Sequence, residues 1–440
     1  MKVLGIGETC DLGDMYWRLM RAGHEVRVYI EDPGSHDVFG GIVPRTEDWE
    51  AELDWIRAAG PEGMVVFESA AKGDWQDALR KDGYSVVGGS LYGDRLESDR
   101  EFGQAALREA GLRTAPTREF RSFDAALNFL KEQPGRYVFK SNGAHALRTR
   151  NYIGQLEDGA DLVAFLESQR EKTGADDPSN TDFVLMDHVE GVEVGIGAYF
   201  NGNRFLDPPL VDWEHKRFFP GDIGELTGEM GTIVSYEAAS QMFANSLGRM
   251  ADQLRAAGHC GYINLNMMAN SEGLWPLEFT SRFGYPGFAI CDALHEEDWA
   301  SILRKMIDPR STSLCTRPGF ACGVVLTVPP FPYRYGYAEL SKGLPITFRR
   351  GTSSAHKDAL HFGEVSKVRG RLVSGGQSGY IGVATGTGVD VPEARRAAYA
   401  AVHDVHIPNM RYRDDIGLRL VNGEMDKLRS WGYLGESGTT

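Results

Sequence analysis

The chain lacks long apolar runs, has few cysteines and carries fewer basic than acidic residues. No window approaches the roughly 18 consecutive apolar residues of a membrane-spanning helix, which excludes a membrane protein. None of the 5 cysteines forms a C-x-x-C pair, which argues against structural zinc and favours a reducing compartment. A formal net charge of -15 argues against a protein that binds a nucleic-acid backbone.

Several site signatures are also missing. Neither the nucleophile motif G-x-S-x-G nor the phosphate-binding loop G-x-x-x-x-G-K-[ST] occurs in the sequence. The histidines of 356–361 and 403–406 have too few Cys or carboxylate neighbours to predict a metal centre. The start, MKVLGIGE, is typical of a first strand and not of a targeting signal, so we expect a cytoplasmic protein.

Glycine is the residue in excess, and the order of patterns along the chain indicates several domains. The 53 glycines predict many turns and close backbone approaches. Strand-like and helix-like segments alternate over 1–92, which predicts a parallel α/β domain. Alternating strands within 93–317 predict a second domain, and 318–440 has an α+β pattern. The predicted fold class is therefore multidomain, α/β followed by α+β.

The helical pattern over 236–258 is the clearest in the chain. Apolar residues recur there at three- and four-residue spacing: Met242, Phe243, Leu247, Met250 and Leu254. Gly258 follows, where a helix-stopping residue is expected. We predict one continuous helix that buries this stripe in the core.

One alternative function rests on the first strand. Gly5 and Gly7 resemble the start of a dinucleotide fingerprint, and Glu31 or Asp32 ends the second strand where a ribose-binding acid would lie. Cys10, however, takes the place of the third glycine. A nicotinamide-dependent oxidoreductase is therefore kept only as a remote alternative.

Four polar segments together supply the kinds of groups that bind the phosphates, base and ribose of a nucleoside triphosphate. Arg100 and Lys140 would neutralise phosphates, and Arg148 lies on a loop that would close over them. The strand end that includes Asp187 and Val189 would present backbone groups to an adenine edge, and Glu193 would accept hydrogen bonds from ribose hydroxyls.

The segment W-P-L-E-F-T-S-R-F-G supplies a predicted magnesium site. Glu278 and Thr280 are two residues apart in a strand, so both side chains point to the same face. Their oxygen atoms are ligands that Mg²⁺ accepts, and Asn264 or Asn266 could add another. Arg282 follows on the same face and would meet charge on a transferring phosphoryl group.

Four segments resemble motifs of one enzyme family. Residues 214–217 read E-H-K-R and residues 224–231 read G-E-L-T-G-E-M-G, where the family has D-H-K-R and G-P-N-T-G-G-M-G. Residues 278–287 read E-F-T-S-R-F-G-Y-P-G against E-F-N-A-R-F-G-D-P-E, and 413–417 read R-D-D-I-G against R-x-D-I-G. The chain thus resembles the ATP-grasp ligases, specifically the phosphoribosylamine–glycine ligase family, over nearly its whole length.

The resemblance implies an ATP-dependent ligase that joins a carboxylate to an amine. It implies ATP and Mg²⁺ as cofactors, an acyl-phosphate intermediate, and glycine or another amino acid as the acid, in a monomer or homodimer. Residues 1–92 would be the pre-ATP-grasp domain and 93–317 the ATP-grasp domain, with a mobile lid subdomain at about 118–200 that keeps water from the acyl phosphate. Lys216 and Arg217 would act with Arg282 in catalysis. Residues carried over to substrate binding are Gly7, Glu8, His215, Thr227, Gly228, Met230 and Gly231.

The chain departs from the family at the lid and at the substrate motifs. The family's glycine-rich lid G-L-A-A-G-K-G-V is G-A-H-A-L-R-T-R over 143–150, with Arg148 in place of its lysine. Thr280 replaces the metal-binding Asn, and G-G-R-E-H-A is absent after Gly7. The resemblance therefore predicts altered substrates, and a non-catalytic ATP-binding homologue is the alternative.

Overall fold

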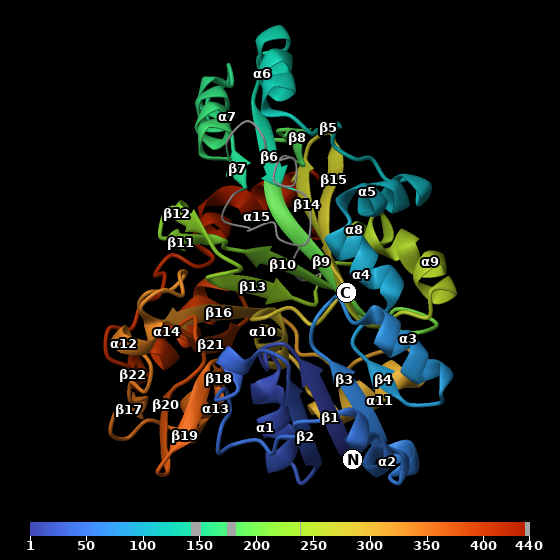
Figure 1. Ribbon diagram of the computed structural model, residues 1–440, viewed down its shortest axis with the longest axis vertical. Coiled ribbons are helices and arrows are strands. Elements are labelled where there is room, and N and C mark those ends of the chain that lie inside the picture. The colour runs from blue at the N-terminus through green and yellow to red at the C-terminus, as the bar shows by residue number, and fades with distance from the viewer. Residues whose placement is uncertain (142–150, 174–181, 238, 436–440) are drawn as a thin grey trace.

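The computed structural model describes residues 1–141, 151–173, 182–237 and 239–435, and Figure 1 draws the whole chain. Three structural units follow one another from the base of the view to its top and back to its middle. No helix within the described ranges is long and apolar enough to cross a membrane.

The N-terminal unit is a parallel sheet flanked by helices, as the sequence predicts. Its four strands pair in the order β2-β1-β3-β4. The strands are β1 (Lys2–Gly7), β2 (Glu25–Ile30), β3 (Gly63–Phe67) and β4 (Val86–Val87), and the helices are α1 (Gly13–Arg21), α2 (Leu53–Arg57) and α3 (Gly73–Lys81). Apolar side chains on both faces bury this sheet, which explains its nearly continuous hydrophobic strands.

Gly5 and Gly7 make room for side chains of their own domain. A Cβ on Gly5 would lie 2.4 Å from the Tyr16 ring, and one on Gly7 would lie 2.3 Å from the Glu68 carboxylate. The two glycines are therefore explained by internal packing, without a bound dinucleotide.

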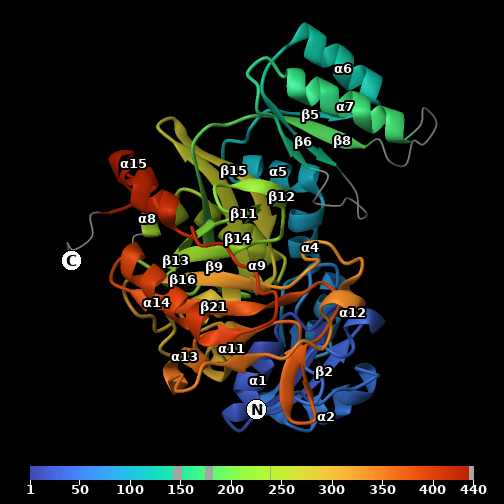
Figure 2. The same cartoon turned by 90° about the vertical axis from the view of Figure 1, so that its left-hand side faces the viewer.

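A small antiparallel unit projects from the top of the molecule. It holds β5 (Thr117–Phe120), β6 (Tyr137–Ser141), β7 (Tyr152–Ile153) and β8 (Phe183–Asp187), in the order β5-β8-β6-β7, with α6 (Phe123–Glu132) and α7 (Ala160–Thr173). Figure 2 shows both helices lying together beside this sheet. A separate apolar core, which includes Leu127, Phe139 and Leu166, holds this 117–187 subdomain together. Helices α4 (Leu91–Ser98) and α5 (Arg100–Glu109) precede it.

The main body is one antiparallel sheet of eight strands in the order β15-β14-β9-β10-β13-β16-β21-β18. Its first five strands are β15 (Gly273–Thr280), β14 (Cys260–Asn270), β9 (Val192–Asn201), β10 (Leu210–Glu214) and β13 (Gly231–Ser235). The other three are β16 (Phe320–Thr327), β21 (Tyr380–Gly388) and β18 (Leu360–Phe362). The strands after residue 318 thus extend the sheet of the preceding unit.

Short elements decorate this body. Three strand pairs are β11 (Arg217–Phe219) with β12 (Ile223–Leu226), β17 (Thr347–Phe348) with β22 (Val405–His406), and β19 (Val365–Val368) with β20 (Arg371–Ser374). Its remaining helices are α10 (Gly287–Asp292), α11 (Trp299–Ile307), α12 (Tyr337–Leu340), α13 (Ser354–Asp358), α14 (Val391–Asp404) and α15 (Met425–Ser430).

The predicted continuous helix over 236–258 is wrong, although its buried stripe is confirmed. The segment forms α8 (Ser240–Ala244), a short 3₁₀ turn and α9 (Ala251–Ala256). The break lies at Ser246, whose hydroxyl donates a 2.6 Å hydrogen bond to the Met242 carbonyl and so competes with the helical backbone. Met242 and Leu254 are both fully buried, and Gly258 ends the segment with a φ of 62°.

Candidate active site

Two adjoining cavities lie between the 117–187 subdomain and the central sheet. The first cavity, of about 230 Å³, contains Arg100, Glu278, Thr280 and Arg282 in its wall. The second, of about 300 Å³, is lined by residues of β6, β8 and β15. Both cavities share Asn151, Glu214, Lys216, Leu226 and Glu278. The predicted phosphate, metal and transfer residues therefore meet in one place.

Three carboxylates surround the ammonium group of Lys216. Its Nζ lies 2.8 Å from Glu193 Oε1, 3.2 Å from Glu214 Oε2 and 3.5 Å from Glu278 Oε1. These acids come from β9, β10 and β15, so the ammonium joins three strands of the sheet. Although burial opposes it, their charges raise the pKa of Lys216 well above its usual value.

Lys140 and Arg100 approach Glu278 from the other side. Lys140 Nζ lies 3.5 Å from Glu278 Oε2, and burial lowers the pKa of Lys140 to about 8. The Nη1 atom of Arg100 is buried and has no hydrogen-bond partner among the described residues. A buried, unpaired guanidinium N–H is unfavourable, and an anionic oxygen would satisfy it.

The predicted magnesium ligands lie on paired strands. Glu278 and Thr280 of β15 are opposite Asn266 and Asn264 of β14. The Asn266 Oδ1 atom is buried and accepts no hydrogen bond from any described residue. No three His, Cys, Asp or Glu side chains of the described ranges could hold a metal ion by themselves. The oxygen donors present fit Mg²⁺, which completes its coordination with water and phosphate.

The second cavity has the apolar lining that a nucleotide base needs. Its apolar residues are Val138, Ile153, Met186, Val189, Leu226, Met268 and Leu277. The predicted nucleotide residues Asp187 and Glu193 also line it. The Asp187 carboxylate accepts a 2.7 Å hydrogen bond from Arg118, and the Asp187 and His188 N–H groups donate to the Pro116 and Arg136 carbonyls.

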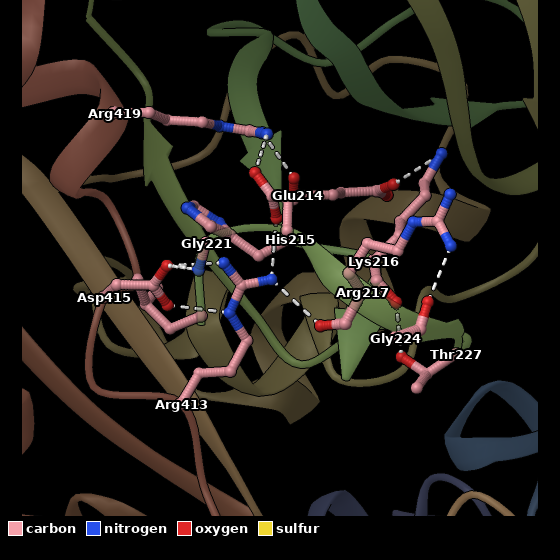
Figure 3. A network of polar contacts seen from close by, with 12 residues as sticks. Glu214, His215, Lys216, Arg217, Gly221, Gly224, Thr227, Arg413, Asp415 and Arg419 are labelled. Carbon is pink, nitrogen blue, oxygen red and sulfur yellow. Dashed lines mark hydrogen bonds and ion pairs between the residues drawn. The ribbon is translucent and has the colours of Figure 1, made fainter. Parts of the chain in front are cut away.

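Most of segment 214–231, which carries the motifs E-H-K-R and G-E-L-T-G-E-M-G, folds as the β11–β12 hairpin beside the cavities. The backbone N–H of Thr227 donates a 2.8 Å hydrogen bond to the Lys216 carbonyl, and Arg217 Nη1 donates one of 2.6 Å to the Gly224 carbonyl. Figure 3 shows these contacts beside the Lys216 and Arg217 side chains. Thr227 and Gly228 line the first cavity and Arg217 the second.

The C-terminal segment 413–417 holds this hairpin in place. The buried Arg413 guanidinium donates 2.9 Å and 2.7 Å hydrogen bonds to the Arg217 carbonyl and to Asp222. It also pairs with Asp415, which accepts a 2.8 Å hydrogen bond from the Gly221 N–H. Figure 3 shows Arg413 between Asp415 and the hairpin backbone.

Several residues carried over to substrate binding lie elsewhere. His215, Met230 and Gly231 are buried and line neither cavity. Burial lowers the pKa of His215 to about 3, and its Nε2 accepts a 3.0 Å hydrogen bond from the Gly417 N–H. Gly7 and Glu8 line a different cavity of about 230 Å³ in the N-terminal unit. Arg148 lies outside the described residues.

Sequence reasoning missed four polar residues of the site. Glu97 lines the first cavity and accepts a 3.2 Å hydrogen bond from Arg282. Asp212 and Glu229 lie deeper, and Glu214 borders both cavities. Asp212, Glu214 and Lys216 alternate along one strand and its continuation, and this spacing places them on a common face.

Comparisons with known proteins agree with this geometry. Residues 98–288 match the family described as phosphoribosylglycinamide synthetase, ATP-grasp (A) domain. A phosphoribosylamine–glycine ligase of Neisseria meningitidis serogroup B is 25% identical, with 96% of this chain and 100% of that protein covered.

Two solved structures share the fold. The phosphoribosylamine–glycine ligase of Thermotoga maritima superposes with a TM-score of 0.71 at 21% identity, over 94% of this chain and 100% of the other. The biotin carboxylase domain of Hydrogenobacter thermophilus 2-oxoglutarate carboxylase, in complex with MgADP and bicarbonate, gives 0.61 at 11% identity, over 97% and 94%. Residues 98–288 thus match an ATP-grasp domain, and the chain is an ATP-dependent carboxylate–amine ligase similar to phosphoribosylamine–glycine ligases over nearly its whole length.

Proposed function

We propose that this carboxylate–amine ligase binds MgATP across the two cavities and activates a small carboxylate as an acyl phosphate. The observation that carries the proposal is the pairing of Lys140 and Lys216 with Glu278, in the wall of a cavity that Arg100 also lines. Cations around one carboxylate in a closed cleft suit a bound polyphosphate and its metal ion. The base would occupy the apolar second cavity, and Glu193 would accept from the ribose.

The chemistry requires charge neutralisation and orientation more than a protein nucleophile. A substrate carboxylate oxygen attacks the γ-phosphorus and the bond to ADP breaks. An amine nitrogen then attacks the acyl carbon, phosphate leaves, and the nitrogen loses a proton. Arg100 and Lys140 would hold phosphate oxygens, and Arg282 would face the transferring group. Glu278, Thr280 and Asn266 would hold Mg²⁺, which would neutralise phosphate charge.

The substrates are proposed to differ from phosphoribosylamine and glycine. Gly7 and Glu8 line a cavity of the N-terminal unit, apart from the ATP site. Tyr285 and Gly287 replace two acidic residues of the family's motif. We propose that the protein is located in the cytoplasm, where a reducing environment suits its five free cysteines. The proposed oligomeric state is a monomer or homodimer.

The test is ADP release with ATP and Mg²⁺. Glycine with phosphoribosylamine generated in the assay is compared with a panel of other acids and amines. Turnover with any pair supports the ligase, and the pair identifies the substrates. ATP binding without turnover across the panel would favour the non-catalytic alternative.

Glu278→Gln is the decisive variant. It should lower ADP release by at least about a hundredfold, since it removes a metal ligand on which phosphoryl transfer depends. Glu272→Gln, on the exposed turn of the same hairpin, is the matched control and should keep full activity. Equal turnover in Glu278→Gln would refute the metal assignment.

A further inference from the structure

A small recess opens from the first cavity behind Thr280. The two spaces share Glu214, Glu229, Thr280 and Gly284. The recess has a volume of about 30 Å³, and Asp212 lies at its inner end with Tyr262 and Asn264. A recess of this volume admits a small polar group that extends from a molecule in the first cavity, and no large one.

Two buried carboxylates of the recess have no cationic partner. Asp212 and Glu229 are 5% and 8% exposed, and neither forms an ion pair with a described Lys, Arg or His. The nearest ammonium, Lys216, is held by Glu193, Glu214 and Glu278. Burial raises the pKa of both carboxyl groups and so favours their neutral forms, and a cation that enters the recess would stabilise their ionised forms.

The hydrogen bonds inside the recess also leave an acceptor open. Asn264 Nδ2 donates a 2.6 Å hydrogen bond to Asp212 Oδ2, and the Thr232 hydroxyl donates to Glu229. Asp212 Oδ1 is buried and accepts no hydrogen bond from the described residues. A Cβ on Gly195 would lie 2.2 Å from this oxygen, so the glycine leaves space for the carboxylate.

We infer that the recess binds the primary ammonium group of a substrate, with Asp212 and Glu229 as its acceptors. An ammonium group has three donors, a positive charge and the size of a water molecule, which match the open acceptor, the unpaired carboxylates and the volume. The inference rests on the proposed function, because Thr280 borders both the metal site and the recess. The ammonium therefore lies next to the carboxylate to be activated.

The ammonium has two possible sources. It belongs to the activated acid, which is then an α-amino acid, or to the amine that attacks the acyl phosphate. Both present the same chemistry to Asp212 and Glu229, so substrate analogues are needed to separate them.

The first experiment measures melting temperature against methylammonium chloride, with MgATP present. Wild type should be stabilised in a saturable way, and tetramethylammonium, which is too large for the recess, should have no such effect. Asp212→Asn and Glu229→Gln should raise the half-saturating concentration by about tenfold or more. Glu225→Gln, on the nearby strand β12 but in the lining of none of the three spaces, is the control and should respond like wild type.

A stabilisation by MgATP itself, measured first in every variant, reports on folding and on the proposed function. If MgATP stabilises the protein but methylammonium does not, or acts equally on wild type and both variants, the recess inference is overturned. If MgATP has no effect, the proposed function fails instead. Glycine compared with acetate then identifies the source, since only an amino-acid substrate makes glycine bind more tightly than acetate.

Discussion

Arg413 Nη1 lies 2.7 Å from Asp222 Oδ1 and joins the C-terminal segment to the turn of the β11–β12 hairpin. Arg413→Ala would leave Asp222, Asp415 and the Arg217 carbonyl without this partner. Because Arg413 is buried whereas Asp222 is exposed and Asp415 is partly buried, loss of these charge-assisted hydrogen bonds should lower the free energy of unfolding by about 1.5–3 kcal/mol. Urea denaturation measures the loss.

A matched control exists for that substitution. Arg310 pairs with Asp308 on the surface, with its side chain 88% exposed, so Arg310→Ala should leave the urea midpoint unchanged. A midpoint for Arg413→Ala that equals the one for Arg310→Ala would show that the hairpin does not depend on Arg413.

Arg100 should control the affinity for ATP. Its buried Nη1 has no partner among the described residues, so a phosphate oxygen would gain a charge-assisted hydrogen bond there. Arg100→Met should raise the ATP concentration for half-saturation by about tenfold or more. Arg108→Met, at an exposed position of the same helix, should bind ATP like wild type, as fluorescence titration with a nucleotide analogue can measure. Equal affinities of the two variants would contradict a phosphate role for Arg100.

Glu68 should make stability depend on pH. Burial, with a smaller contribution from Asp11, raises the pKa of Glu68 from 4.5 to about 8. Between these values the folded chain holds a proton that the unfolded chain releases, so the free energy of unfolding falls as pH rises. Glu68→Gln should remove this part of the decline.

Urea midpoints at about pH 5, 6.5 and 8 measure the effect across the window of the raised pKa. The difference between wild type and Glu68→Gln isolates this carboxyl from other groups that titrate in the same range. Glu25→Gln, exposed at the start of β2, should keep the wild-type slope. A Glu68→Gln protein with the wild-type slope would disprove the assignment.

Local patterns predicted the parts of the site that are local in sequence. The two-residue spacing of Glu278, Thr280 and Arg282 was sufficient to place them in one cavity wall. Parallel strands near the N-terminus and the buried stripe at Met242 follow from periodicity in the same way. Periodicity could not reveal the break at Ser246, because a side-chain hydrogen bond to the preceding turn leaves the apolar spacing intact.

Contacts between residues far apart in the chain could not be predicted from the sequence. Asp212 and Glu229 border the same recess although a hairpin separates them. His215 was carried over to substrate binding because it stands between Glu214 and Lys216, yet alternation turns it to the other face, against Gly417. Motif position does not specify which way a strand residue faces, whereas the strand period does.

The pairing of β13 with β16 determines whether the C-terminal unit can be separated from the rest of the chain. Gly231 to Val234 form a ladder with Ala321 to Val324, across the boundary that the sequence suggested near residue 318. A chain cut there would expose two unpaired strand edges, which favour aggregation. The two units therefore fold as parts of one sheet, and exchange of the C-terminal part alone would break this strand pairing.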